Sequence, residues 1–217
     1  MLQLPPTGAG ERRLAPRLRL PPHAPGMRIG LFGGSFNPPH EGHRAASLFA
    51  MKRLGLDRVW WLVSPGNPLK DTRELPSLGK RMAAARARAR HPRIDVTDVE
   101  AQLCTRYTVD TIRGLSRRCP SVHFVWVMGV DNFVDFHRWR AWRDIFALVP
   151  ISVVDRGGVG LGALGRPAAE AFRRHRLPES AARRLAISKP PAWVLLHGLK
   201  SAVSSTTLRQ KIRSRGG

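Results

Sequence analysis

Short apolar runs alternate with amphipathic segments along most of this chain, and the alternation limits the folds open to it. The strand-like runs comprise residues 27–32, 58–63, 93–99, 122–128, 151–154 and 193–196. Helical patterns separate most of them, at residues 43–55, 78–90, 108–119 and 140–149. Apolar strands that alternate with helices build parallel sheets covered on both faces. We therefore predict an α/β protein with an open parallel sheet and helices on both of its faces.

Two segments interrupt the alternation. Residues 1–26 are rich in proline and arginine and show no sustained periodicity, which predicts a disordered arm. Met27 opens the first strand-like run and is a candidate for the functional start. Residues 27–217 are then expected to form a single domain, since this length suffices for one core. Within that domain, the glycine-rich residues 156–170 are interpreted as a mobile loop.

The formal net charge of +22 raises the question of a nucleic-acid partner. The basic residues are mostly arginines set among alanines, as in RMAAARARARHPR at residues 81–93. This pattern is typical of a solvated helix face, so we expect no nucleic-acid partner. A positive field would still attract small polyanions such as nucleotides.

The number of cysteines and the hydropathy of the chain indicate in which cellular compartment the protein is expected. The two cysteines, Cys104 and Cys119, form no CxxC pair, which argues against a disulfide framework or a zinc site. No apolar run approaches the roughly 20 residues that a membrane span requires. We expect a cytoplasmic protein without a membrane partner.

The stretch GGSFNPPHEGH, residues 33–43, has an unusual composition for the start of a helix. It follows the first predicted strand, and ligands of open α/β sheets bind at the carboxyl ends of strands. Gly33 and Gly34 allow the backbone to approach a ligand closely, and the free N–H groups of the following helix favour phosphate. His40 and His43 are placed to donate hydrogen bonds to phosphate oxygens and to carry positive charge when needed.

Other ligand-binding motifs do not fit this stretch. It lacks the GxGxxG spacing of dinucleotide-binding folds, and the chain contains no GxxxxGK[ST] phosphate loop. The histidines of HEGH are three residues apart, whereas the zinc-binding HExxH motif needs a spacing of four. A phosphate-binding role for the histidine pair is the interpretation that remains.

The motif resembles the GG[ST]F[DN]PxHxGH signature of the bacterial nicotinate-nucleotide adenylyltransferases, members of the HxGH nucleotidyltransferase superfamily. Further similar blocks follow in the family's order: SPGNPLKD at 64–71, YTVDT at 107–111, MGVDNFVDFHRWRAWRDI at 128–145 and VSSTTLRQKIR at 203–213. The resemblance covers the chain from Met27 to about Arg213. Asn37 departs from it, since many relatives carry aspartate there.

The resemblance implies a Rossmann-like nucleotidyltransferase fold and the transfer of an adenylyl group from ATP to nicotinate mononucleotide, with Mg²⁺ held mainly through the ATP phosphates. His40, His43 and Arg209 would be the catalytic residues. The residues implied for ATP are Gly33, Gly34, Ser35, Phe36, Gly129, Asp131, Ser204, Ser205 and Thr206. Those implied for the mononucleotide are Asn37, Lys70, Thr108, Trp139, Arg140 and Arg156. Asp131 would accept hydrogen bonds from the ATP ribose, and Trp139 would stack on the pyridine ring.

Two alternatives stay open on the sequence alone. Another adenylyltransferase of the superfamily, acting on phosphopantetheine or on nicotinamide mononucleotide, would share the HxGH site, but the YTVDT and FxxWxxW blocks argue against it. An RNA-binding protein related to the class I aminoacyl-tRNA synthetases is the other. Against it, the chain has no KMSKS-like loop, no RRM aromatic signature and no anticodon-binding extension.

Overall fold

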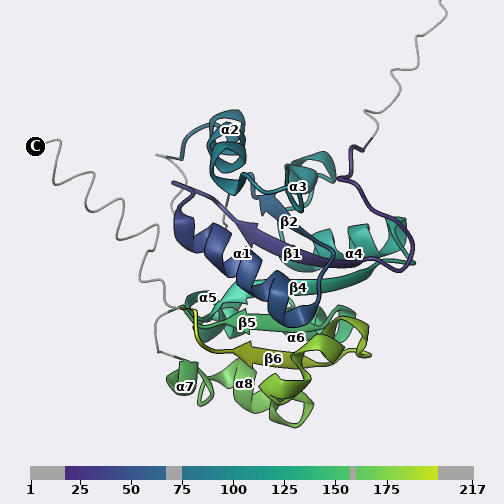
Figure 1. Ribbon diagram of the computed structural model, residues 1–217, viewed down its shortest axis with the longest axis vertical. Coiled ribbons are helices and arrows are strands. Elements are labelled where there is room, and N and C mark those ends of the chain that lie inside the picture. The colour runs from purple at the N-terminus through teal and green to yellow at the C-terminus, as the bar shows by residue number, and fades with distance from the viewer. Residues whose placement is uncertain (1–17, 67–74, 157–159, 200–217) are drawn as a thin grey trace, which may run out of the picture.

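The sheet of this protein is wholly parallel, as the sequence predicts. The computed structural model describes residues 18–66, 75–156 and 160–199. Its strands are β1 (Arg28–Gly34), β2 (Arg58–Val63), β3 (Ile94–Thr97), β4 (His123–Gly129), β5 (Ile151–Val154) and β6 (Trp193–Leu196). They are ordered β3-β2-β1-β4-β5-β6, and each neighbouring pair is parallel (Figure 1). This order is that of the Rossmann fold.

Helices cover both faces of the sheet. The α-helices are α1 (Glu41–Leu54), α2 (Leu78–Ala89), α3 (Val99–Gln102), α4 (Thr108–Arg118), α5 (Val130–Val134), α6 (Trp142–Leu148), α7 (Gly160–Ala163) and α8 (Pro167–Ala171). Three 3₁₀ helices are also present: η1 (Phe136–Arg138), η2 (Arg173–His175) and η3 (Glu179–Ile187). The four longer predicted helices correspond to α1, α2, α4 and α6.

Two hydrophobic clusters lie on opposite faces of the sheet. Successive side chains of a strand point to opposite faces, so Trp60 belongs to the cluster under α4, α6 and α8. Its neighbour Trp61 belongs to the cluster under α1, α2 and η3. Both rings are fully buried. Continuous apolar runs such as RVWWLV are therefore explained by burial on both faces.

The glycine-rich segment 156–170 differs from the mobile loop that was predicted. It contains α7 and α8, although residues 157–159 lie outside the described part of the chain. Pro167 opens α8, a position where its missing N–H costs nothing. Ala163 and Ala168 are buried in the core. Small side chains that pack against the sheet hold this segment in place, and glycine content alone did not indicate that packing.

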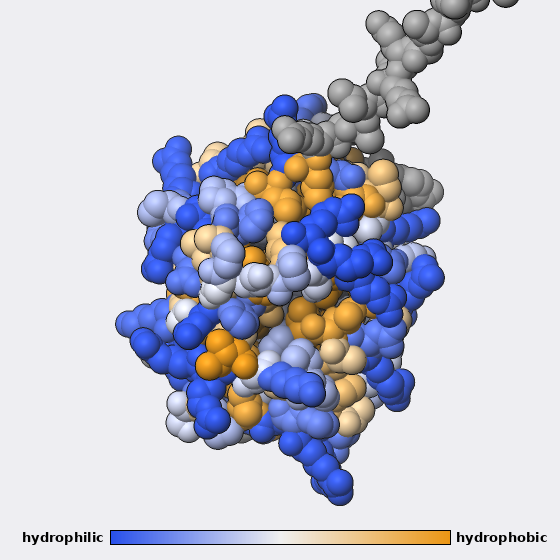
Figure 2. Space-filling model, turned by 90° about the vertical axis from the view of Figure 1, so that its right-hand side faces the viewer, coloured by the Kyte–Doolittle hydropathy of each residue, from blue (hydrophilic) through white to orange (hydrophobic). Residues whose placement is uncertain are grey.

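Residues 18–26, which the sequence assigned to a disordered arm, pack against the domain instead. Leu18 and Leu20 pack against the core, the Arg19 N–H donates to Gln102 Oε1 at 2.7 Å, and the Gly26 N–H donates to the Ser121 carbonyl at 2.7 Å. Residues 18–26 thus form an ordered strap across the amino-terminal ends of the strands. Figure 2 faces this side of the molecule, where hydrophobic side chains show among hydrophilic ones. Residues 1–17 lie outside the described part of the chain.

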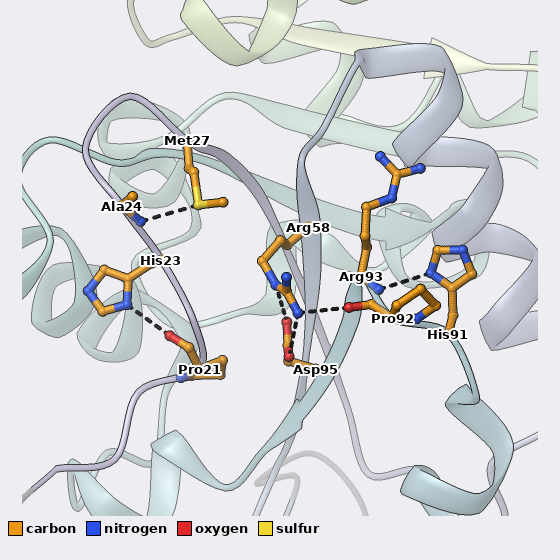
Figure 3. Close-up of polar contacts among 9 residues, drawn as sticks. All are labelled: Pro21, His23, Ala24, Met27, Arg58, His91, Pro92, Arg93 and Asp95. Atoms are coloured by element: carbon orange, nitrogen blue, oxygen red, sulfur yellow. Dashed lines mark hydrogen bonds and ion pairs between the residues drawn. The ribbon is translucent and has the colours of Figure 1, made fainter.

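An ion pair ties the edge strand β3 to β2. The Arg58 guanidinium donates from Nε to Asp95 Oδ2 at 2.7 Å and from Nη2 to Asp95 Oδ1 at 2.9 Å (Figure 3). Nη2 also donates to the Pro92 carbonyl at 2.9 Å. These contacts raise the pKa of Arg58, chiefly through the hydrogen bond to Asp95. A bidentate contact of this kind fixes the register of two neighbouring strands.

Across the described ranges, no helix has both the length and the apolar character needed to cross a lipid bilayer.

Candidate active site

The strand order reverses direction between β1 and β4, and the candidate site lies where these two strands end. The chain passes from β1 to β2 on one side and from β4 to β5 on the other, which opens a crevice at the carboxyl ends. Gly33 and Gly129 line this edge. A Cβ at Gly33 would lie 2.6 Å from Trp126 Cη2, and one at Gly129 would lie 3.1 Å from Arg156 Nη2. A side chain at Gly33 would displace the buried Trp126 ring, and one at Gly129 would force the Asp131 and Arg156 side chains to move.

His40 and His43 are hydrogen-bonded to each other across the first turn of α1. His40 occupies the N-cap position, and its backbone N–H donates to His43 Nδ1 at 3.2 Å. The backbone N–H of His43 donates in turn to the His40 carbonyl at 3.0 Å. The ring centroids are 3.8 Å apart. Because Nδ1 of His43 accepts, a neutral His43 carries its proton on Nε2 and keeps a donor for a ligand.

Burial keeps both histidines neutral. Desolvation, aided by the charge of Arg156, lowers the pKa of His40 to about 4. Desolvation, aided by His40 and Arg156, lowers the pKa of His43 to about 3. Without a ligand both imidazoles are therefore neutral at pH 7, and the positive charge that they were expected to carry when needed stays a prediction. At neutral pH the imidazoles act as hydrogen-bond donors, and the charge beside them is that of Arg156.

An aromatic stack supports the histidine pair. Phe36 has a φ of 46° and is buried against Trp61, with ring centroids 4.8 Å apart and planes 18° apart. Its centroid also lies 4.9 Å from that of His43. Trp61 Nε1 donates to Ser47 Oγ at 2.7 Å, and Ser47 Oγ donates to the His43 carbonyl at 2.9 Å. The stack joins β2, the loop after β1 and the first turns of α1.

Asp131 and Arg156 lie together at the ends of β4 and β5. Arg156 Nη2 contacts Asp131 Oδ1 at 2.6 Å. The guanidinium is largely buried, with 14% of its side chain exposed, whereas Asp131 has 58% exposed. Both charges act on the pKa of His40. The two residues predicted for different substrates are thus paired beside the histidines, and their individual roles stay predictions.

The residues predicted for the pyridine ring also converge. Trp139 is half-buried and packs edge-to-face on Trp126, with centroids 6.3 Å apart. The Arg140 guanidinium lies over the Tyr107 ring at 4.6 Å. Tyr107 is the N-cap residue of α4, which begins at Thr108. The blocks YTVDT and FxxWxxW therefore meet in space, although about thirty residues separate them in the sequence.

Five predicted site residues lie outside the described part of the chain, and two others lie in a described loop. Lys70 and the C-terminal residues Ser204, Ser205, Thr206 and Arg209 lie outside the described part of the chain. Ser35 and Asn37 lie in the described loop between β1 and α1. The bound roles predicted for all of these residues stay predictions.

Arg81 is a buried residue beside the candidate site whose contacts the sequence reading missed. It was assigned to the solvated arginine face of α2, yet only 3% of it is exposed. Its guanidinium donates to four backbone carbonyls, three of them just after β1 and β2 and one just before α2. One signal could have revealed it: Arg81, Ala85 and Ala89 follow the spacing of one helix face, and that face is buried.

Comparisons with known proteins agree with this geometry. A sequence model of the cytidylyltransferase-like family matches residues 31–211. A probable nicotinate-nucleotide adenylyltransferase from Bradyrhizobium sp. strain BTAi1 is 59% identical over 183 residues, which cover 84% of this chain and 95% of that protein. A protein of the same name from Rhizobium meliloti strain 1021 is 51% identical over 183 residues, 84% of this chain and 97% of the relative.

Solved structures support the fold. The nicotinic acid mononucleotide adenylyltransferase of Plasmodium falciparum, complexed with NaAD, superimposes with a TM-score of 0.61 at 17% identity, covering 85% of this chain and 83% of that one. The same enzyme complexed with APC gives a TM-score of 0.59, covering 84% and 82%. Identity at this level establishes a shared fold, whereas the bacterial relatives establish the family. The chain belongs to the cytidylyltransferase-like proteins and, among them, to the nicotinate-nucleotide adenylyltransferases.

Proposed function

We propose that this enzyme transfers the adenylyl group of ATP to nicotinate mononucleotide, releasing pyrophosphate and nicotinate adenine dinucleotide for the biosynthesis of NAD in the cytoplasm. The observation that carries the proposal is the histidine pair at the start of α1, which faces the crevice between β1 and β4. The name shared by relatives that are 51–59% identical points to the same reaction.

The chemistry requires positioning more than covalent help. An oxygen of the mononucleotide phosphate attacks the α-phosphorus of ATP, a new P–O bond forms, and the bond to pyrophosphate breaks. Transfers of this type are accelerated by alignment and by stabilisation of developing negative charge. His40 and His43 supply neutral N–H donors, the start of α1 supplies backbone N–H groups, and Arg156 supplies positive charge.

The two nucleotides approach from opposite sides of β1. Asp131, which follows β4, would accept hydrogen bonds from the ATP ribose, and its contact with Arg156 would then be exchanged for a contact between Arg156 and phosphate. The C-terminal residues Ser204, Ser205, Thr206 and Arg209 would add donors to the ATP phosphates. Lys70 would serve the mononucleotide phosphate.

The pyridine ring would stack on Trp139, with its carboxylate held by backbone N–H groups near Thr108 and Arg140. The Arg140 guanidinium over Tyr107 adds positive charge beside that pocket. Nicotinamide mononucleotide carries an amide there, whose own N–H donors would face donors. The pocket should therefore favour the acid.

Mg²⁺ would enter with ATP, since magnesium keeps several waters and is commonly held by substrate phosphates. The residues at the site suit such an arrangement, because the Asp131 carboxylate is already paired with the Arg156 guanidinium. The ion would then be held by the phosphates and not by this carboxylate. When bound, the ion would neutralise charge on the leaving pyrophosphate.

A pyrophosphate-release assay with ATP and each mononucleotide tests the proposal. We expect kcat/KM for nicotinate mononucleotide to exceed that for the amide by a factor on the order of 10² to 10⁴. Trp139→Ala should weaken both acceptors by similar factors, because both rings stack. An enzyme without turnover of the acid would refute the function, and equal use of both acceptors would indicate dual specificity. A preference that collapses in Trp139→Ala would move the basis of selectivity to the ring platform.

A further inference from the structure

Arg81 is a buried cation that joins three backbone segments. Its Nε donates to the Pro76 carbonyl at 2.9 Å, its Nη1 to the carbonyls of Ser35 and Ser64 at 2.9 and 2.7 Å, and its Nη2 to the Pro65 carbonyl at 3.1 Å. Burial lowers the pKa of this guanidinium from its usual value. The converging carbonyl dipoles stabilise the charge, which a buried cation needs.

The acceptors lie at the catalytic edge of the sheet. Ser35 follows β1, and Ser64 and Pro65 follow β2. The Ser64 N–H donates to the Gly34 carbonyl at 3.0 Å, so the two strand ends run side by side up to the residues that Arg81 holds. β2 and β4 flank β1 on opposite sides. With the ATP ribose placed at Asp131 after β4, the N–H groups at the ends of β1 and β2 are left for the phosphate of the mononucleotide.

The contacts of Arg81 set the direction of two peptide groups. The Ser35–Phe36 and Pro65–Gly66 peptides are trans, since the cis bonds in the described ranges lie elsewhere. In a trans peptide the C=O and N–H point in opposite directions. When Arg81 draws the two carbonyls inward, the N–H groups of Phe36 and Gly66 turn away from it. Backbone donors held in this way can bind an anion.

The same contact bears on the aromatic stack. Phe36 lies in the left-handed region, with a φ of 46°, which a bulky residue adopts only when its surroundings hold it. Arg81 fixes the peptide immediately before Phe36. The Phe36 ring contacts Trp61 and His43. These ring contacts hold the Phe36 side chain independently of Arg81, so loss of the Arg81 contact should act mainly on the direction of the backbone N–H groups.

Lysine cannot replace this arrangement. A guanidinium offers five donors in a planar fork, whereas an ammonium offers three from one point at the end of a flexible chain. The three guanidinium nitrogens Nε, Nη1 and Nη2 each donate to a carbonyl of a different segment. Lysine at this position would keep the positive charge and lose the forked set of hydrogen bonds. Substitution by lysine therefore separates the effect of the charge from the effect of the hydrogen bonds.

We propose that Arg81 is a positioning residue for the acceptor: it holds the Ser35–Phe36 and Pro65–Gly66 peptides so that their N–H groups bind the phosphate of nicotinate mononucleotide. The inference rests on the proposed function, since it names that reaction's acceptor. Arg81 touches neither nucleotide and acts through the backbone that it holds.

Amide hydrogen exchange of the parent protein, followed by NMR, tests the donors directly. Nicotinate mononucleotide at saturation should slow exchange of the Phe36 and Gly66 amides by about tenfold or more. ATP alone should slow exchange at Gly66 much less, whereas Phe36 lies among the residues implied for ATP and is compared only with the mononucleotide bound. The amides of the strap, such as Arg19, serve as internal controls that neither ligand should change. Unchanged exchange at both Phe36 and Gly66 would overturn the proposal, and this readout needs no variant that has to fold.

Kinetics of Arg81→Lys supply the second test, with Arg86→Lys, an exposed position on the same helix, as the matched control. We expect Arg81→Lys to lose on the order of 10² in kcat/KM for the mononucleotide, since small misplacements have effects of this size. Its KM for ATP should stay within threefold, and Arg86→Lys should match the parent. Equal losses for both substrates, or a folded Arg81→Lys with parent activity, would overturn the proposal. Failure of the parent enzyme itself to use nicotinate mononucleotide would instead refute the proposed function.

Discussion

Single side chains at the start of α1 combine burial with hydrogen-bonding capacity. His43 offers Nδ1 to the His40 N–H and keeps Nε2 as a donor, while its pKa of about 3 keeps the ring neutral. A donor that is already desolvated and oriented stabilises developing charge without reorganising. This explains why two histidines, and not two lysines, suit a crevice that already contains Arg156.

Removal of that donor should slow the chemical step. We predict that His43→Ala lowers kcat by roughly 10², because one preorganised donor commonly contributes about 3 kcal/mol to the transition state. The KM for the mononucleotide should change less. His123→Ala, an exposed position at the opposite end of β4, is the control and should match the parent. A His43→Ala enzyme within about threefold of the parent would exclude a catalytic donor role.

The depressed pKa values also predict how stability depends on pH. In the unfolded chain a histidine titrates near pH 6.5, whereas the folded values are about 4 for His40 and about 3 for His43. Between these values the unfolded state binds more protons, so the free energy of unfolding falls as the pH drops from about 7. It is unaffected by this pair at higher pH. Each histidine should contribute a loss on the order of 1–2 kcal/mol by pH 5.

Urea denaturation of parent and His43→Asn between pH 8 and pH 5 measures this dependence. Asparagine offers an acceptor oxygen to the His40 N–H and does not titrate. The variant should therefore lose less stability than the parent on acidification. His123→Asn, at an exposed position, should follow the parent curve. Parallel curves for parent and His43→Asn would contradict the buried neutral state of His43.

Among the elements, the edge strand β3 depends on its ion pair with β2. The side chains of Arg58 and Asp95 are 19% and 18% exposed, and their contact is bidentate. We predict that Asp95→Asn lowers the free energy of unfolding by about 1 kcal/mol, at the upper end for surface pairs. That corresponds to a fall of about 2–4 °C in Tm for a chain of this size.

A second pair separates the effect of burial from that of distance. Arg113 and Asp144 approach to 2.6 Å, but their side chains are 43% and 51% exposed. Asp144→Asn should change Tm by less than half as much as Asp95→Asn, because solvent screens the exposed pair. Equal effects of the two substitutions would show that burial does not set the strength of these contacts. Activity should be unchanged in Asp95→Asn, since the pair lies away from the crevice.

Secondary structure could be predicted from sequence wherever burial imposes a pattern. The bounds predicted for β2, β5 and β6 agree with the structure, because continuous apolar runs accompany strands buried on both faces. The helices α7 and α8 were missed, since their few packed residues are alanines and produce no periodic signal. The role of Arg81 was also missed, because it depends on carbonyls from positions 35, 64, 65 and 76, which only the fold brings together.

At the scale of the whole molecule, the strap at residues 18–26 is expected to stabilise the fold, although its composition indicated disorder. Leu18 and Leu20 are partly buried against the core, and full burial of such side chains contributes about 1.5–3 kcal/mol each. We predict that a chain starting at Leu18 keeps the Tm of the parent. A chain starting at Met27 should lose about 1–3 kcal/mol in stability and keep its turnover at 25 °C.

Thermal unfolding and the pyrophosphate assay on the two shortened chains check this prediction. The chain starting at Leu18 is the control for that starting at Met27, since they differ only in the strap. An unchanged Tm in the shorter chain would show that the strap packs without stabilising. Loss of turnover in a folded chain starting at Met27 would assign residues 18–26 a part in catalysis.

All six strands point the same way, and this has a practical consequence for attaching the enzyme to a surface. The strap lies at the amino-terminal ends of the strands, on the right in Figure 1, whereas the crevice lies at their carboxyl ends. A bead or electrode linked through the chain before Leu18 would therefore meet the molecule on the side away from the crevice. Immobilised in that orientation, the enzyme should keep its KM values, whereas coupling through random surface groups would block part of the population.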